Sequence, residues 1–169
     1  DTSTALGYDT WLSSLSVARK INQNWTGLAR NYLLYTNRKG NSVNAYEDRF
    51  QIGVAYRDGE RNRSNMLAKY EYWTARDGAG FSNISGTDNG VTSFSKHIFS
   101  IHEDYHPSRK WWMTGHLAGK WQTDKFDGRS DSYSAFLASG RVNYDISDKW
   151  DVSVLASSLI LRTSIPSTS

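Results

Sequence analysis

The chain has 169 residues, which suits a single domain, and it contains no cysteine, which excludes a disulfide framework and a thiolate metal site. Aromatic residues make up 14% of the chain, with 7 Trp and 10 Tyr, whereas a disordered chain would be poor in them. The net charge of +3 is not gathered into one basic run, so nucleic acid is not expected as a partner, and no apolar run approaches the roughly 18 residues of a membrane helix.

Alternating apolar and polar residues predict long β-strands along almost the whole chain, because successive side chains of a strand point to opposite faces. In one such segment Phe50, Ile52, Val54 and Tyr56 stand at every second position. Helical spacing is nowhere sustained. The eight strands predicted in this way are residues 10–20, 25–37, 47–57, 64–76, 92–105, 111–123, 132–144 and 150–161, and a polar tail follows at 162–169.

The connections between the predicted strands alternate in length. Turn-forming residues dominate the short ones, and Gly, Asn, Ser and Asp dominate the long ones. Short and long connections would therefore lie at opposite ends of an antiparallel up-and-down meander, which predicts a single β-barrel domain over residues 1–169. The short connections are 21–24, 58–63, 106–110 and 145–149, and the long ones are 38–46, 77–91 and 124–131.

The apolar set of each predicted strand faces either a dry protein core or lipid. Three features favour lipid: Tyr and Trp at strand ends, strands of about 11–14 residues where soluble strands have about 5–6, and frequent Gly and Ala that would leave cavities in a core. We therefore predict a transmembrane barrel with its apolar side chains outward. The aromatic residues expected at the lipid interface are Trp25, Tyr56, Tyr105, Trp111, Tyr144 and Trp150.

The opposite set of side chains carries both signs of charge and is predicted to face the lumen. Eight strands make the smallest usual membrane barrel, whose interior is filled by side chains, and unpaired cations would be unfavourable there. A wider barrel would admit water, so we expect either eight strands or part of a larger barrel. The charged residues expected in the lumen are Lys20, Arg30, Arg49, Arg57, Lys69, Glu71, Asp104, Lys120 and Arg141.

Three repeated units carry a family resemblance: GVAYRDGERNRSNMLAKYEYW, IHEDYHPSRKWWMTGHLAGKW and VNYDISDKWDVSVLAS. They resemble strand–turn–strand units of Gram-negative outer-membrane β-barrel proteins, in particular the C-terminal barrel regions of large bacterial surface proteins. The resemblance implies a place in the bacterial outer membrane, contact with membrane lipid and lipopolysaccharide, and other outer-membrane or surface-exposed proteins as partners. It carries over no active-site residue, and the terminal aromatic residue of such barrels is missing from this sequence.

No set of residues predicts catalysis, a metal or a cofactor. His102 and His116 are expected inward on paired strands with Asp104 nearby, but two histidines and one carboxylate are thin grounds for a metal site. His106 and Ser108 superficially resemble the His-x-Ser arrangement of a lipid A deacylase barrel, without an evident acid to orient the histidine. We therefore predict a protein that is not an enzyme, and keep a lipid hydrolase as an alternative.

The function predicted from the sequence is a membrane anchor, a display scaffold or a small-solute pore. If a lumen is open, its basic residues predict a mild preference for anions. The alternative is a soluble all-β barrel in which exposed Trp and Tyr bind carbohydrate or lipid. Detergent dependence separates the two readings.

Overall fold

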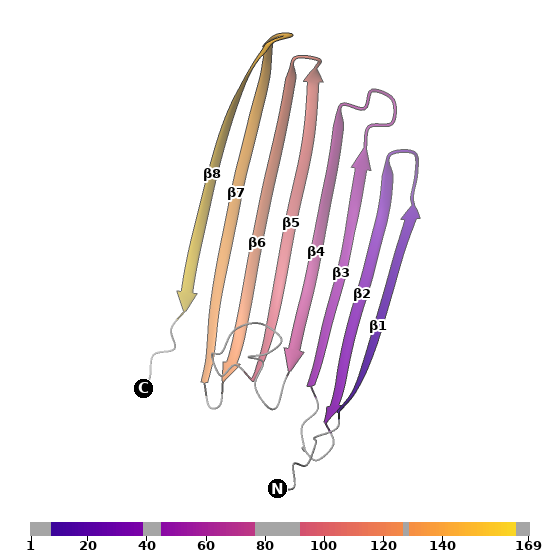
Figure 1. Ribbon diagram of the computed structural model, residues 1–169, viewed down its shortest axis with the longest axis vertical. Helices are drawn as coiled ribbons and strands as arrows, with labels where there is room; N and C mark the ends of the chain where they lie inside the picture. The colour runs from indigo at the N-terminus through magenta and orange to yellow at the C-terminus, as the bar shows by residue number, and fades with distance from the viewer. Residues whose placement is uncertain (1–7, 39–44, 77–91, 127–128, 165–169) are drawn as a thin grey trace, which may run out of the picture.

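The structure, a computed structural model, describes residues 8–38, 45–76, 92–126 and 129–164. These residues form strands joined by turns, and no helix that could cross a bilayer is present among them. Figure 1 shows the strands side by side. They are β1 (Tyr8–Lys20), β2 (Trp25–Arg38), β3 (Ala45–Arg57), β4 (Ser64–Arg76), β5 (Ser93–Ser108), β6 (Trp111–Phe126), β7 (Arg129–Ser147) and β8 (Trp150–Ser164).

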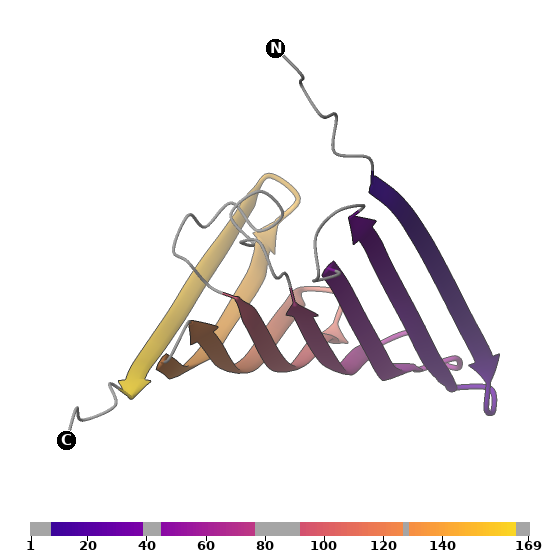
Figure 2. The same cartoon turned by 90° about the horizontal axis from the view of Figure 1, so that it is seen from below.

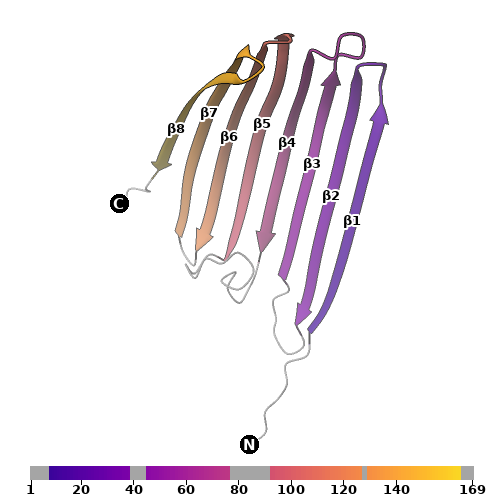
Figure 3. The ribbon, with the colours of Figure 1, turned by 45° about the horizontal axis from the view of Figure 1, so that its top comes forward.

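All eight strands belong to one antiparallel sheet, and their order in the sheet is their order in the chain. This confirms the all-β, up-and-down meander expected from the sequence. The sheet is open, because among the described strands β1 and β8 each pair on one side only. Figures 2 and 3 show the sheet twisted and bent, with β1 and β8 at its two edges.

Several strands are longer than the sequence pattern indicated. β5 runs on to Ser108, so most of the predicted turn at 106–110 is strand, and β8 continues to Ser164, three residues into the predicted polar tail. The predicted long connection 124–131 is wrong, because β6 and β7 stay paired up to Phe126 and Arg129. Residues 39–44, 77–91 and 165–169, which hold the rest of the long connections and the tail, lie outside the described residues.

The register of the ladders assigns every strand residue to one of two faces, since directly opposed partners share a face. The face that contains Phe50, Ile52 and Val54 is called the apolar face, and the face that contains Arg49 and Glu71 is called the polar face. The most buried side chains all lie on the polar face, so the sheet curves toward it. They are Ala45, Glu71, Ala75, Phe94, Ser100 and Gln122.

The apolar face is not covered by a second layer among the described residues. Phe136 is 48% exposed and Val152 is 49% exposed, and Phe50, Ile52 and Val142 are also exposed. The small hydrophobic cluster of Ala75 and Phe94, with Trp73 and Phe126, lies on the other face. A sheet normally buries its hydrophobic face against another layer, and the described residues supply no such layer for the apolar face.

The polar face changes character toward both edges of the sheet. In the middle strands it carries most of the charged residues, whereas at the edges it carries leucines. These are Leu12, Leu28 and Leu34 on β1–β2 and Leu137, Leu155, Leu159 and Leu161 on β7–β8. The polar face of the edge strands is therefore mixed, with these leucines beside Lys20, Arg30 and Arg141.

Candidate functional site

The aromatic residues expected at an interface lie together on the apolar face, at the end of the sheet where the short turns are. Trp25 stands directly across from Tyr56 with ring centroids 4.9 Å apart, and Trp111 stands across from Tyr144 at 4.5 Å. Tyr105 and Trp150 share this face and this end. The six residues therefore form one row, called the turn-end row, although the sequence alone did not pair them.

A second aromatic row, which the sequence reasoning missed, crosses the apolar face near the other end. Tyr35 stands between its partners Trp11 and Tyr46, and Trp121 lies farther along the sheet on β6. We call it the loop-end row. The signal for it was present as a spacing of ten residues, since Trp25 and Tyr35, Tyr46 and Tyr56, and Trp111 and Trp121 are each ten apart.

Both rows cross the sheet obliquely and by the same amount. Following the register from β3 to β6, Tyr56 leads to Gly115 and Tyr46 leads to Lys125. Trp111 and Trp121 each stand four residues closer to the short turns than these positions. Between the β2–β3 pair and the β6–β7 pair, each row is therefore displaced by about 13 Å along the strands over about 19 Å across four strand spacings. The rows thus make an angle of about 35° with the lines that join register partners.

The surface between the two rows is mainly apolar, and two pairs of its polar groups bond to each other. Asn31 Nδ2 donates to Asp48 Oδ1 at 2.7 Å, and the Tyr70 hydroxyl and His97 Nδ1 are also 2.7 Å apart. On β6 the ring of Trp121 lies over Gly119, where an added Cβ would come within 3.0 Å of it. Glycine in this strand thus makes room for a ring of the loop-end row.

The nine charged residues expected to line a lumen all lie on the polar face. Arg49 Nε donates to Glu71 Oε1 at 2.6 Å, and Gln51 Nε2 donates to Glu71 Oε2 at 2.6 Å. Glu71 is only 2% exposed, so both of its oxygens are satisfied where desolvation would otherwise be costly. This carboxylate is a structural group rather than a free acid or base.

A cation–aromatic cluster extends this network across β3, β4 and β5. The Arg49 guanidinium lies 4.9 Å from the Trp73 ring centroid, and Lys96 Nζ lies 4.2 Å from the ring centroids of Trp73 and Phe94. Lys96 was not among the residues singled out from the sequence. Aromatic faces stabilise cations in partly desolvated sites, which explains how the polar face holds an excess of positive charge.

The residues considered for a metal site or for catalysis do not form a complete site among the described residues. His102 and His116 do approach, with ring centroids 6.0 Å apart, and His102 Nε2 lies 3.5 Å from Asp104 Oδ2. No group of three metal-binding side chains forms in the described ranges. The His106 ring stacks on Trp112 at 5.4 Å, while Ser108 Oγ accepts the Lys110 N–H at 3.3 Å. Neither contact activates Ser108 as a nucleophile.

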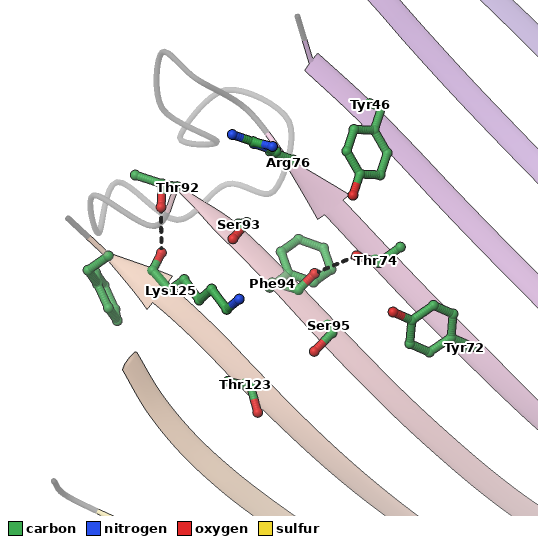
Figure 4. Close-up of a pocket in the computed structure, with 11 residues that line it drawn as sticks. Tyr46, Tyr72, Thr74, Arg76, Thr92, Ser93, Phe94, Ser95, Thr123 and Lys125 are labelled. Carbon is green, nitrogen blue, oxygen red and sulfur yellow. Dashed lines mark hydrogen bonds between the residues drawn. The ribbon is translucent and has the colours of Figure 1, made fainter. Parts of the chain in front are cut away.

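A hollow of about 660 Å³ opens at the long-connection end of β3–β6 (Figure 4). Most of its lining residues belong to the apolar face, and they carry hydroxyl groups and two cations. Thr74 Oγ1 donates to the Phe94 carbonyl at 3.1 Å, which ties two walls of the hollow together. The lining residues on the apolar face are Tyr46, Tyr72, Thr74, Arg76, Ser93, Ser95, Thr123 and Lys125.

A comparison of the chain with protein-family models, with curated proteins and with solved structures finds no match. The resemblance to outer-membrane barrels drawn from the three repeated units therefore stays a prediction. Any function has to be argued from the two faces of the sheet.

Proposed function

We propose that the chain forms the wall of a transmembrane β-barrel in a bacterial outer membrane and serves as an anchor or display scaffold, or as a small-solute pore, without enzymatic activity. The spacing of the two aromatic rows carries this proposal. Ten residues span about 33 Å along a strand, and a tilt of about 35° reduces this to a height of about 27 Å. Membrane barrels have strands tilted by about 35–45° and an apolar band about 25 Å tall between aromatic girdles.

The uncovered apolar face supports the same proposal. A soluble barrel would gather Phe50, Ile52 and Phe136 into its interior, yet these side chains are exposed and the buried ones lie on the opposite face. Acyl chains would cover this face without a second protein layer. The exposure of these side chains favours a membrane barrel over the soluble carbohydrate- or lipid-binding barrel.

The connections suggest an orientation. The turns between β1 and β2, β3 and β4, β5 and β6, and β7 and β8 are short and lie at one end of the sheet. At the other end the connection between β4 and β5 spans residues 77–92, although that between β6 and β7 spans only 127–128. In outer-membrane barrels the short turns are periplasmic and the longer loops are outside. The turn-end row would then mark the periplasmic interface, and the loop-end row would mark the external one.

A pair of arginine substitutions on neighbouring residues of β6 tests the proposal. Leu117 lies on the apolar face between the two rows, and His116 lies on the polar face. Leu117→Arg should lower the free energy of unfolding in lipid vesicles by about 2–4 kcal/mol, because arginine on the lipid face is costly at mid-height. His116→Arg places the same charge on the other face and should cost much less. Urea unfolding in vesicles, followed by Trp fluorescence, measures both variants.

Two results would reject the membrane proposal. One is an equal effect of Leu117→Arg and His116→Arg on the folding free energy. The other is a protein that stays folded and monodisperse in buffer without detergent or lipid.

A further inference from the structure

The hollow at the long-connection end of β3–β6 is built from cross-strand rows of polar residues. Arg76, Ser93 and Lys125 are register partners on three neighbouring strands, and Thr74, Ser95 and Thr123 form the next row. Figure 4 shows these residues with Tyr46 and Tyr72 beside them. The eight lining side chains on the apolar face thus present two cationic groups and six hydroxyls, phenolic on the two tyrosines and aliphatic on the two serines and two threonines. This surface is therefore dense in hydrogen-bond donors.

 Thr92 adds a seventh hydroxyl, because it also lines the hollow, and this hydroxyl donates to the Lys125 carbonyl at 3.0 Å.

The charge of this hollow is positive. Arg76 and Lys125 are both exposed. Among the described residues of β3–β7 at this end, the apolar face carries one carboxylate, that of Asp48, and Asn31 already donates to it at 2.7 Å. Asp124 and Asp131 lie on the opposite face of the sheet. Within the part of the chain that the structure describes, an anion entering the hollow would meet two cations and little competition from carboxylates.

We propose that the hollow binds the phosphate of a lipid headgroup, an inference that rests on the proposed membrane function. Arg76 would hold two phosphate oxygens through paired N–H donors, Lys125 would contribute a point charge, and the Ser93 hydroxyl between them would donate a further bond. Toward the short turns the same face becomes apolar, with Phe99 and Leu117 on β5 and β6. The acyl chains of a bound lipid would lie on that surface.

Calorimetric titration of the detergent-solubilised protein tests the proposal with three probes. These are inorganic phosphate, dihexanoyl phosphatidic acid, and zwitterionic dihexanoyl phosphatidylcholine as the control lipid. We expect phosphatidic acid to bind and the control lipid not to bind. Arg76→Gln combined with Lys125→Gln should weaken binding on the order of tenfold or more, because both charge-assisted contacts are lost. Arg109→Gln combined with Lys149→Gln removes the same charge at the short-turn end and should leave binding unchanged.

The outcomes separate the source of the phosphate. Tighter binding of phosphatidic acid than of inorganic phosphate supports a lipid ligand, and equal binding supports recognition of the phosphate group alone. No binding of either probe, or equal weakening by the two double variants, overturns the site. Vesicle insertion, judged with Leu117→Arg, is a separate readout, so the site can fail while the membrane proposal stands.

Discussion

At the scale of single residues, Gly53 is a position where the sheet leaves no room for a side chain. A Cβ there would lie 2.8 Å from the Ala68 carbonyl oxygen and 3.2 Å from Lys69 Cβ. Backbone atoms of a paired strand cannot move aside cheaply, and glycine in a strand often marks such a close approach. The alternating pattern could not reveal this, because it gives the face of a residue and not its distance from the next strand.

Gly53→Ala should therefore lower the free energy of unfolding by about 1–3 kcal/mol, the usual cost of overpacking. Gly115→Ala is the matched control, since an added Cβ at Gly115 meets nothing within 4 Å. Both variants restrict the unfolded chain equally, so the difference between them reports the clash. Denaturant titration in detergent measures it, and equal stability of the two variants would contradict the close approach.

At the scale of elements, the turn between β3 and β4 is organised by Asp58. Its carboxylate accepts the backbone N–H groups of Arg61 at 3.1 Å, Glu60 at 3.3 Å and Arg63 at 3.4 Å. Asn62 closes the turn with a φ of 51°, a left-handed conformation that asparagine tolerates better than most residues. The pKa of Asp58 is held below its ordinary value of 3.8, and the largest cause is the hydrogen bond from the Arg61 N–H.

A carboxylate whose pKa is lower in the folded state stabilises the protein above its unfolded pKa and loses that contribution as the pH falls through the folded pKa. Asp58→Asn should therefore cost stability at neutral pH, and the difference from the unmodified protein should shrink in acid. Glu60→Gln removes the same charge from the same turn and leaves the Asp58 carboxylate in place as the acceptor. Folding free energies measured from about pH 2 to pH 7 test this. A constant difference for Asp58→Asn would contradict it.

The strands themselves were largely predictable, and their ends were not. Alternation placed all eight strands, because long half-covered strands follow period two closely. Composition misled at residues 124–131, where Asp, Gly and Ser indicated a loop. The ladder continues there beside two local side-chain contacts: Arg129 lies 4.7 Å from the Phe126 ring centroid and 2.8 Å from Asp131 Oδ2.

The candidate sites were predictable only in part, because most of their contacts join residues of different strands. A Trp after a short turn signals the turn-end row, and alternation assigns the charged residues to one face. The partners of Glu71, the position of Lys96 between two rings and the hollow beside Arg76 each depend on the register of three or more strands. No local pattern fixes that register.

At the scale of the whole molecule, the open edges of the sheet and the leucines on its polar face favour one arrangement. Unpaired strand edges are not tolerated in lipid, and leucines on the polar face would be unfavourable in a wide, water-filled lumen. If β8 pairs with β1, the leucines of β1–β2 and β7–β8 become neighbours. They would fill one half of a narrow interior, and the Arg49–Glu71 network would fill the other. Eight-stranded barrels have interiors of this filled kind.

The register of that closure follows from the aromatic rows. They shift by four residues over four strands, which extrapolates to about eight residues around eight strands. Following the paired residues strand by strand across the sheet, Ser157 on β8 leads to Lys20 on β1. Eight residues farther toward the long-connection end of β1 stands Leu12. Ser157 and Leu12 are therefore expected to face each other across the seam.

Because the chain has no cysteine, disulfide trapping tests this seam cleanly. Leu12→Cys with Ser157→Cys should form an intramolecular bond in vesicles, as should the paired positions Ser139→Cys with Ser157→Cys. Leu67→Cys with Ser157→Cys, four strands apart in the sheet, should not. A bond through Thr10 or Ser14 in place of Leu12 would keep the closure and change the stagger. A disulfide-linked dimer would mean that a second copy supplies the partner strand. Single-channel conductance would show that the interior is not filled. Either result would overturn the narrow eight-stranded barrel.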